Sequence, residues 1–342
     1  MTETMQRIVL ASRPDAKPEP ANFRLEEVPM PIPGEGEFLA RTIWLSLDPY
    51  MRGRMSAAKS YAKPVEIGET MTAQVVAEVV ASHHPDYAPG DIVIAPFGWA
   101  SHGISDGTMI EKIDGDAAPL SAYLGVLGMP GTTAWVGLND IAAAQPGETI
   151  VVSAATGAVG SLVGQLAKLK GMRVIGVAGG AEKCAYAVEE LGFDTCLDHR
   201  ALDKAELTEA IAKAAPDGVH VYFENVGGKT LEATLPNMRD FGRIAICGMI
   251  AWYSGADNPA PAPVVWGAIL RQKLRVQGFI VFDHWNRRPA FLEEVAPLVK
   301  AGKITFRETV EDGLQNAPAA FLRLLEGGNF GKQLVRVGAD PA

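Results

Sequence analysis

The sequence predicts an α/β protein in which a doubly wound parallel sheet of six strands is inserted in a partly barrel-shaped, antiparallel β domain. Three observations lead to this prediction. Residues 1–127 contain short β-type runs between proline and glycine turns, residues from about 130 onwards alternate strand and helix patterns, and residues 302–337 return to β character. Parallel strands need crossover connections, which the alternating helices supply. We therefore expect one domain from residues 1–127 with 302–342, and a second from residues 128–301.

The first part is predicted to be antiparallel because its apolar runs are short and bounded by turn residues. Runs at 38–44, 71–80 and 91–94 predict strands, and Pro89 and Gly90 form the turn before the last of them. Alternate prolines in residues 28–34 fix φ and remove backbone donors, so this segment cannot be helical. In the tail we expect further β structure and one helix at 317–326.

Strands and amphipathic helices alternate from residue 149 onwards. The run TIVVS at 149–153 predicts a buried strand, and the helix predicted at 158–170 has apolar side chains on one face. Further strands are predicted at 173–177, 195–198, 220–225, 243–248 and 276–281. Further helices are predicted at 182–191, 203–214, 229–238, 264–270 and 288–300. This order is typical of a doubly wound sheet.

Composition excludes several classes of protein. The 342 residues carry 31 Lys and Arg against 40 Asp and Glu, a formal net charge of -9, which disfavours nucleic acid and anionic membranes as partners. Three cysteines cannot form a disulfide framework for a chain of this size, which indicates a reducing compartment. The first residues do not resemble a signal peptide, and no apolar run reaches the roughly 20 residues of a membrane helix. We expect a cytoplasmic protein.

A glycine-containing turn joins the strand at 149–153 to the amphipathic helix. Gly157 would allow a diphosphate to approach the backbone, and Gly160 would allow the helix to pack tightly against the strand. The N–H groups and dipole at the helix start would then hold the diphosphate. The first position of this fingerprint is Ala154 rather than glycine, and an ordinary βα turn is the alternative. The strand–turn–helix context favours a dinucleotide site.

The end of the second strand indicates which dinucleotide binds. An NAD site usually has Asp or Glu there to hold the ribose 2′-hydroxyl, but no carboxylate follows Val177 until Glu182. Lys183 lies just beyond, where a cation would meet a 2′-phosphate, although a solvated helix residue is an equal alternative from the local sequence. We therefore predict NADPH rather than NADH.

Zinc ligands are not apparent in the sequence. The cysteines, Cys184, Cys196 and Cys247, are widely spaced, and the adjacent His83 and His84 have no cysteine near them. Structural zinc sites need about four Cys or His ligands, and catalytic ones about three with water. We therefore predict no metal site.

Several sequence blocks together resemble a known family. They are LSLDPYMRGRM at 45–55, GMPGTTAW at 128–135, AVG at 158–160, FENVGG at 223–228, GRIAICG at 242–248 and GNFGK at 328–332. The chain resembles the medium-chain dehydrogenase/reductase superfamily, and within it the zinc-independent leukotriene B4 12-hydroxydehydrogenase/prostaglandin reductase group, which includes curcumin-type reductases. The resemblance implies a Rossmann domain for NADPH, inserted in a GroES-like catalytic domain for substrate, and a homodimer.

The resemblance also implies site residues. The diphosphate would contact the glycine turn, Lys183 would meet the 2′-phosphate, and His199 stands where relatives carry a second phosphate-side tyrosine. If His199 makes that contact, NADPH affinity should fall as the pH rises through neutrality. Implied cofactor-binding residues are Gly157, Ala158, Val159, Gly160, Lys183, His199, Asn225, Cys247, Gly248, Met249, Ile250, Phe279, Ile280, Val281 and Asn329.

Reduction of a conjugated carbonyl fits a site without metal. Hydride from nicotinamide C4 would add to the β-carbon of an α,β-unsaturated ketone or aldehyde and leave an enolate that needs hydrogen-bond donors. The resemblance implies that Tyr253 lines the active site and assists reduction, although an aromatic interface or lid residue is the alternative. Asp48, Tyr50 and Arg52 could line the substrate cleft, with a structural Asp48–Arg52 ion pair as the alternative.

Two other functions stay open at this point. A quinone reductase would use the same fold and NADPH, also without metal. A nucleotide-binding protein with a structural or regulatory role would bind NADPH without catalysis. The leading hypothesis is an NADPH-dependent reductase of a small hydrophobic enone or enal.

Overall fold

A computed structural model describes residues 3–114, 118–253 and 262–341. The chain forms two compact units, Met1–Gly125 with Glu308–Ala342, and Val126–Arg307. None of the helices in the described ranges is long and apolar enough to cross a membrane.

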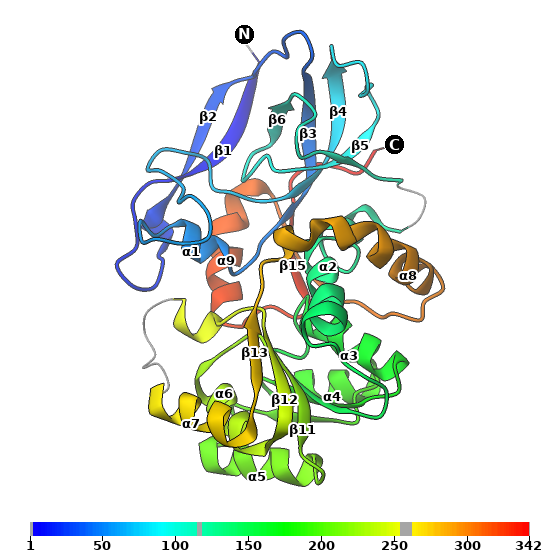
Figure 1. Cartoon of the computed structure of the whole chain (residues 1–342). Coiled ribbons are helices and arrows are strands. Elements are labelled where there is room, and N and C mark those ends of the chain that lie inside the picture. The colour runs from blue at the N-terminus through cyan, green and yellow to red at the C-terminus, as the bar shows by residue number, and fades with distance from the viewer. Residues whose placement is uncertain (1–2, 115–117, 254–261, 342) are drawn as a thin grey trace. The chain divides into compact units, whose positions relative to one another are not determined.

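The second unit contains a six-stranded sheet in the order β10-β9-β8-β11-β12-β13, with parallel pairing throughout (Figure 1). The strand order reverses beside β8, so β8 and β11 flank the topological switch point where nucleotides bind in such sheets. The predicted doubly wound sheet is confirmed. Its strands are β8 (Thr149–Ser153), β9 (Arg173–Ala178), β10 (Thr195–Asp198), β11 (Val219–Glu224), β12 (Met238–Ile246) and β13 (Arg275–Gly278).

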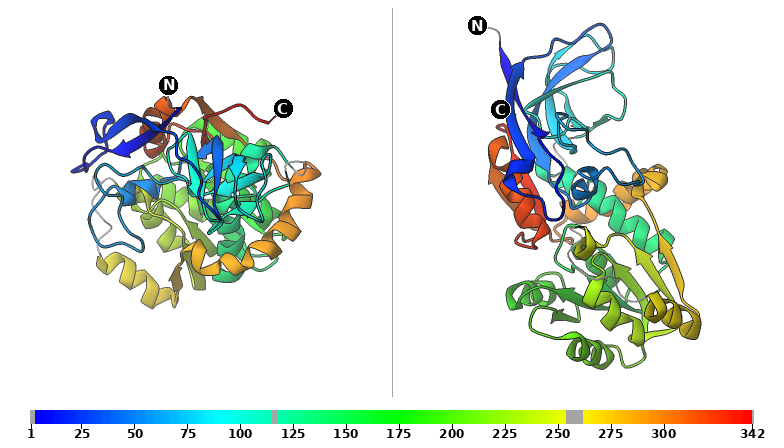
Figure 2. Two further views of the ribbon diagram at one scale, coloured as in Figure 1. Left: turned by 90° about the horizontal axis from the view of Figure 1, so that it is seen from above. Right: turned by 90° about the vertical axis from the view of Figure 1, so that its left-hand side faces the viewer.

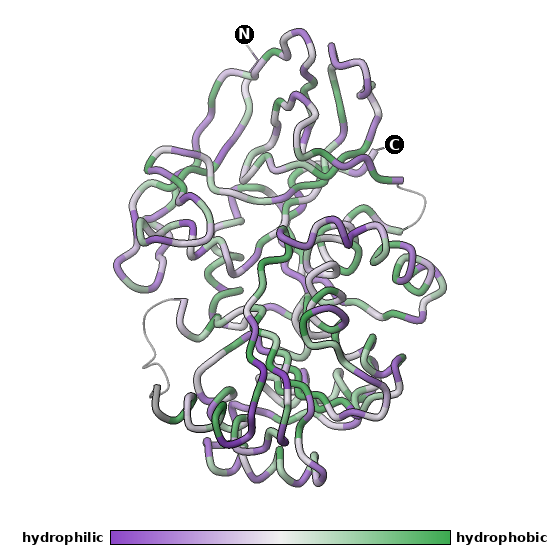
Figure 3. Tube along the Cα trace, in the orientation of Figure 1, coloured by the Kyte–Doolittle hydropathy of each residue, from purple (hydrophilic) through white to green (hydrophobic). Residues whose placement is uncertain are grey.

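Helices cover both faces of this sheet (Figure 2). On one face α3 buries Leu162, Val163 and Leu166, while α5, α6 and α7 pack on the other face through a cluster that includes Leu207 and Ile211. Apolar residues follow the inner strands in Figure 3, in keeping with their burial. The helices are α2 (Met129–Val136), α3 (Gly160–Leu169), α4 (Ala181–Glu189), α5 (Lys204–Ala214), α6 (Gly228–Thr234), α7 (Ala262–Gln272) and α8 (Arg288–Lys300).

Two predicted elements of this unit end well before the expected residue. The helix predicted at 229–238 stops at Thr234, and a 3-10 turn containing Pro236 leads into β12. Proline has no N–H with which to continue a helix. The strand predicted at 276–281 stops at Gly278, because the strand that it pairs with, β12, ends at Ile246.

The first unit contains a seven-stranded sheet in the order β14-β15-β3-β4-β5-β7, with β6 paired to β3, and a separate β1–β2 hairpin. All pairs in this sheet are antiparallel except β14–β15. The strand predicted at 71–80 begins only at Val75. The elements are β1 (Thr4–Leu10), β2 (Phe23–Pro29), β3 (Phe38–Ser46), α1 (Met51–Arg54), β4 (Val75–Ser82), β5 (Ile92–Ala95), β6 (His102–Ser105), β7 (Glu111–Lys112), β14 (Glu308–Asp312), α9 (Ala317–Leu325) and β15 (Lys332–Arg336).

An aromatic core joins the two segments of this unit. Phe23 stacks on Trp99 with ring centroids 5.4 Å apart, and Phe321 from α9 meets the Trp99 ring edge-on at 5.6 Å. The tail therefore packs into the same core as the N-terminal segment, and the predicted insertion of an α/β unit in a β unit is confirmed.

Candidate nucleotide-binding and active site

The turn after β8 has the geometry that the glycine pattern predicts. A Cβ on Gly160 would lie 2.4 Å from the Ala154 carbonyl oxygen, so only glycine allows α3 to begin this close to the strand. Ala154 itself has φ of 48°, a left-handed conformation that costs a non-glycine residue about 1 kcal/mol. The Gly157 N–H donates to the Ala154 carbonyl at 2.9 Å. The first N–H groups of a helix have no partners within it, so residues 158–160 at the start of α3 present donors suited to a diphosphate.

A buried carboxylate organises the adjacent strand end. Glu224 closes β11 and is 1% exposed, and its Oε1 accepts from the N–H groups of Val226 at 2.6 Å and Gly227 at 3.0 Å and from Ser153 Oγ at 2.9 Å. Burial raises the pKa of the Glu224 carboxyl, and these hydrogen bonds oppose the rise. Ser153 and Glu224 are not among the site residues predicted from the sequence. For Glu224 the usable signal is a charged residue at the end of an apolar strand.

Asn225 is fixed between the ends of β8 and β11. Its side-chain Nδ2 donates to the Ser153 carbonyl at 2.7 Å, and its N–H donates to Ser153 Oγ at 2.8 Å. Its own carbonyl accepts from the Ile250 N–H at 3.2 Å. Asn225 therefore lies beside the turn that would hold the diphosphate.

Tyr253 folds back over the end of β12. The Met249 N–H donates to its hydroxyl at 3.2 Å, and a Cβ on Gly248 would lie 3.1 Å from that hydroxyl and 3.5 Å from the Asn225 carbonyl. The structure thus brings Tyr253 together with Asn225 and the predicted residues 247–250. Residues 254–261, which follow Tyr253, lie outside the described residues.

The remaining residues of this edge have packing contacts. Cys247 donates its N–H to the Glu224 carbonyl at 2.9 Å, and burial raises the pKa of its thiol. The Phe279 ring meets the Phe223 ring edge-on at 6.5 Å, next to the buried Val281. Phe279–Val281 therefore follow the end of β13 at the same edge of the sheet, with Phe279 half-buried against the core residue Phe223.

Basic side chains gather where β9 ends. A Cβ on Gly179 would lie 2.9 Å from Arg200 Nε and 3.0 Å from His199 Nε2, so both side chains lie against this glycine. Burial and then the Arg200 charge lower the pKa of Lys183, which places Lys183 in the same corner. Asp198 Oδ1 accepts from the N–H groups of Gly180 and Arg200 at 2.8 and 2.9 Å. Arg200 was missed by the sequence analysis, although its position next to His199 was a usable signal.

The candidate residues of the first unit have separate partners. Asp48 binds Lys332 Nζ at 2.9 Å and accepts from Ser46, whereas Arg52 Nη2 donates to the Ala16 carbonyl at 2.6 Å. The alternative of an Asp48–Arg52 ion pair is therefore wrong, because Asp48 faces β15 and Arg52 faces the loop around residue 16.

Two further candidates belong to the same unit. Burial and then Asp48 raise the pKa of Tyr50. Asn329 Nδ2 donates to the Gly331 carbonyl at 2.7 Å and so stabilises the turn before β15.

Metal-binding side chains do not cluster within the part of the chain that the structure describes: no group of three or more His, Cys, Asp or Glu residues there could hold a metal ion. The three cysteines are free thiols.

A dinucleotide turn at the switch point of a parallel sheet is typical of a dinucleotide-binding protein, and the matches to known families indicate an oxidoreductase. Residues 6–113 match a family model described as the N-terminal domain of oxidoreductase, and residues 158–297 match one described as zinc-binding dehydrogenase.

Individual relatives indicate which group of reductases within this class the chain resembles. The chain is 50% identical to NADPH-dependent curcumin reductase of Escherichia coli (strain K12) over 98% of this chain and 97% of that protein. It is 38% identical to the NADP(+)-dependent 2-alkenal reductase of Nicotiana tabacum over 98% of each. The crystal structure of CurA from Vibrio vulnificus in complex with NADPH superimposes with a TM-score of 0.93, at 47% identity, over 98% of this chain and all (100%) of that one. The chain belongs to the zinc-independent reductase group of the medium-chain dehydrogenase/reductase superfamily that contains these proteins.

Proposed function

We propose that this protein is an NADPH-dependent oxidoreductase that reduces the C=C bond of α,β-unsaturated ketones and aldehydes. One observation carries the proposal: the Tyr253 hydroxyl lies over Gly248 and beside Asn225, at the carboxyl edge of the sheet where the dinucleotide turn also lies. The relatives' names, curcumin reductase and 2-alkenal reductase, support this class of substrate.

The residues present fit NADPH. The backbone at 157–160 can hold the diphosphate only because Gly160 has no Cβ to displace the helix start. Lys183 and Arg200 would supply the positive charge that a 2′-phosphate needs, with His199 beside Arg200 at Gly179. No Asp or Glu follows Val177 before Glu182, the stretch in which NAD sites typically carry one. Two hydrogen bonds to Ser153 hold Asn225 in place, so that Asn225 would orient the nicotinamide end of NADPH. When bound, NADPH supplies the hydride.

Tyr253 would stabilise the charge that develops on the substrate oxygen. Hydride addition to the β-carbon moves an electron pair through the conjugated system onto that oxygen, and a proton then adds to the α-carbon. A hydroxyl that accepts from a backbone N–H, as Tyr253 does from Met249, is polarised into a stronger donor. The tyrosine therefore acts as a preorganised enolate donor.

Tyr253→Phe tests this role. We expect kcat on a linear enone to fall about 10²–10³-fold, while the Kd for NADPH changes little, because the phenol touches the substrate oxygen rather than the diphosphate. Stopped-flow oxidation of NADPH and calorimetry measure the two quantities. Tyr87→Phe, which removes a hydroxyl in the other unit, is the matched control. Wild-type turnover by Tyr253→Phe would remove the proposed role.

The same assay separates the other functions. A higher kcat/KM on a simple quinone than on a linear enone would favour quinone reduction. NADPH oxidation that does not respond to either compound would favour a protein that binds the nucleotide without catalysis. Loss of activity with a chelator, restored by zinc, would contradict the proposed chemistry without metal.

A further inference from the structure

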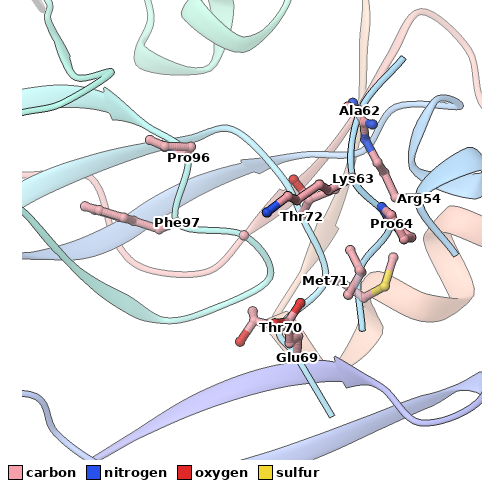
Figure 4. A pocket seen from close by; sticks show the side chains of 12 residues that line it. Arg54, Ala62, Lys63, Pro64, Glu69, Thr70, Met71, Thr72, Pro96 and Phe97 are labelled. Carbon is pink, nitrogen blue, oxygen red and sulfur yellow. The ribbon is translucent and has the colours of Figure 1, made fainter. Parts of the chain in front are cut away.

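Thiols are nucleophiles that the proposed reaction does not use. The pocket of the first unit in Figure 4 has charged and apolar side chains around it, among them Arg54 and Phe97, but the described residues that line it include no cysteine. The three cysteines of the chain all belong to the second unit, and each is a free thiol. Two of them, Cys184 and Cys196, lie in hydrogen-bond contact with each other.

A helix and a strand bring the Cys184 and Cys196 side chains together. Cys184 is in the first turn of α4, where its N–H donates to the Gly180 carbonyl at 3.2 Å. Cys196 is in β10 and pairs with Gly176 of β9, and a Cβ on Gly176 would lie 3.0 Å from Cys196 Sγ. Because glycine has no side chain, it leaves room for the Cys196 sulfur on the face of the sheet that α4 covers.

The two thiols differ in acidity, and neither is enclosed. The contact with Cys196 lowers the pKa of the Cys184 thiol, whereas the same contact and then burial raise the pKa of the Cys196 thiol. Both residues are half-buried, so a small oxidant can reach them. The thiolate is the reactive form of cysteine, so Cys184 is the nucleophile of the pair. By contrast, burial raises the pKa of the Cys247 thiol to about 12.

We propose that Cys184 and Cys196 form a reversible disulfide when the protein meets hydrogen peroxide, and that this disulfide weakens NADPH binding. The Cys184 thiolate attacks one peroxide oxygen, the O–O bond breaks, and the hydroxide that leaves takes up a proton and becomes water. The Cys196 thiol then attacks the sulfur of the resulting sulfenic acid, the S–O bond breaks, and a second water leaves. The two sulfurs thus lose two electrons, which the peroxide accepts. A dithiol restores both cysteines by exchange.

The cysteine pair adjoins the corner predicted for the 2′-phosphate. Lys183 directly precedes Cys184 in α4. Asp198, two residues after Cys196, accepts from the Gly180 N–H at 2.8 Å and so connects β10 to the start of α4. Because a covalent bond is shorter than a hydrogen-bond contact, the disulfide draws the first turn of α4 toward β10 and displaces Lys183. This consequence rests on the proposed role of Lys183, whereas formation of the disulfide does not.

Peptide mass spectrometry tests the disulfide. Trypsin releases residues 184–200, which contain both cysteines, as one peptide. The protein without coenzyme is treated with peroxide, unfolded and alkylated. We expect this peptide to lack two hydrogen atoms and to take up no alkyl group, while Cys247 of the same sample is alkylated. Dithiothreitol before alkylation should restore both sites, and Cys184→Ser should leave Cys196 open to alkylation.

Calorimetric Kd values, measured after the peroxide is removed, test the effect on binding. We expect oxidation to raise the Kd for NADPH about threefold or more, with a smaller change for NADH, because only NADPH carries the phosphate that Lys183 would meet. Dithiothreitol should reverse the change. Cys184→Ser is the matched control: its methionines meet the same oxidant, but it cannot form the bond, so its Kd should not respond.

The outcomes separate the parts of the proposal. Alkylation of both cysteines after peroxide, or a bond between two chains, would overturn the disulfide. A disulfide that leaves the Kd for NADPH unchanged would overturn its effect on binding. Equal affinity of the reduced protein for NADPH and NADH would instead contradict the proposed coenzyme site.

Discussion

We expect the choice of coenzyme to depend on three side chains at the end of β9, which are Lys183, His199 and Arg200. The Arg200 and His199 side chains lie against Gly179. Burial first, and neighbouring cations second, lower the pKa of Lys183 and of His199. A bound 2′-phosphate would favour the charged form of both side chains. The sequence predicted Lys183 and His199 here, whereas Arg200 emerged only from the contact with Gly179.

Lys183→Ala should weaken NADPH binding about tenfold or more, and leave NADH binding nearly unchanged, because only NADPH carries the phosphate that the ammonium meets. Arg200→Ala should act in the same direction. Calorimetric Kd values for both coenzymes measure the effect, with Lys213→Ala on the exposed face of α5 as the control. Equal weakening of NADPH and NADH would contradict the assignment.

His199 predicts a pH dependence. Burial, then Lys229, then Arg200 lower the pKa of its imidazole, and Asp198 opposes them. A phosphate dianion would raise this pKa, so NADPH binding takes up a proton. The affinity for NADPH should then fall as the pH rises from the lowered pKa of the free protein through the higher pKa of the complex.

Calorimetry across this pH range, in wild type and His199→Ala, measures the effect. The second ionisation of the phosphate, near pH 6, acts in the opposite direction and is common to both proteins. Superimposable pH profiles for the two proteins would exclude the His199 contact.

At the scale of elements, the predicted bounds of helices and strands are correct where clear turn signals flank one hydrophobic pattern. They are wrong where strand pairing or a proline sets the end of the element. The strand at 149–153 and the helix at 288–300 have the predicted bounds, because both are bounded by clear turn signals. The helix α2 was not predicted, because Pro130 and Gly131 are residues typical of turns. Proline fits the first turn of a helix, and a Cβ on Gly131 would lie 2.0 Å from the Val126 carbonyl oxygen.

The strand β13 bears on the predicted homodimer. Among the residues that the structure describes, β13 pairs with β12 alone, so its other edge offers unpaired backbone groups. The helix α7, which leads into β13, exposes Trp266 to 68% and Leu270 to 79%. An exposed strand edge beside large apolar side chains is typical of an interface.

We predict a homodimer through this edge. Trp266→Glu and Leu270→Glu should increase the monomer fraction in sedimentation or light scattering, because each would place a charge in the interface. Ile32→Glu, at an exposed residue of the other unit, is the control. A wild-type protein that is monomeric at micromolar concentration would contradict the prediction.

For the whole molecule, the sequence by itself determined the class of fold and the chemistry of the dinucleotide turn. Hydrophobic periodicity indicates which face of a helix or strand is buried. Glycine spacing indicates where a ligand or another segment must lie close to the backbone. Burial and close approach can therefore both be inferred from local sequence. The identity of Tyr253 as a candidate donor also came from sequence, through the family resemblance.

Only the tertiary structure decided which distant residues meet. Ser153, Glu224 and Asn225 form one network because β8 and β11 are neighbours in a sheet whose order differs from the order along the chain. Asp48 pairs with Lys332, nearly the whole chain away, rather than with Arg52 four residues on. Local sequence specifies which side chains are polar and which are apolar. The partner of a buried charge is decided by the tertiary structure, because packing determines which oppositely charged or hydrogen-bonding group lies within contact distance.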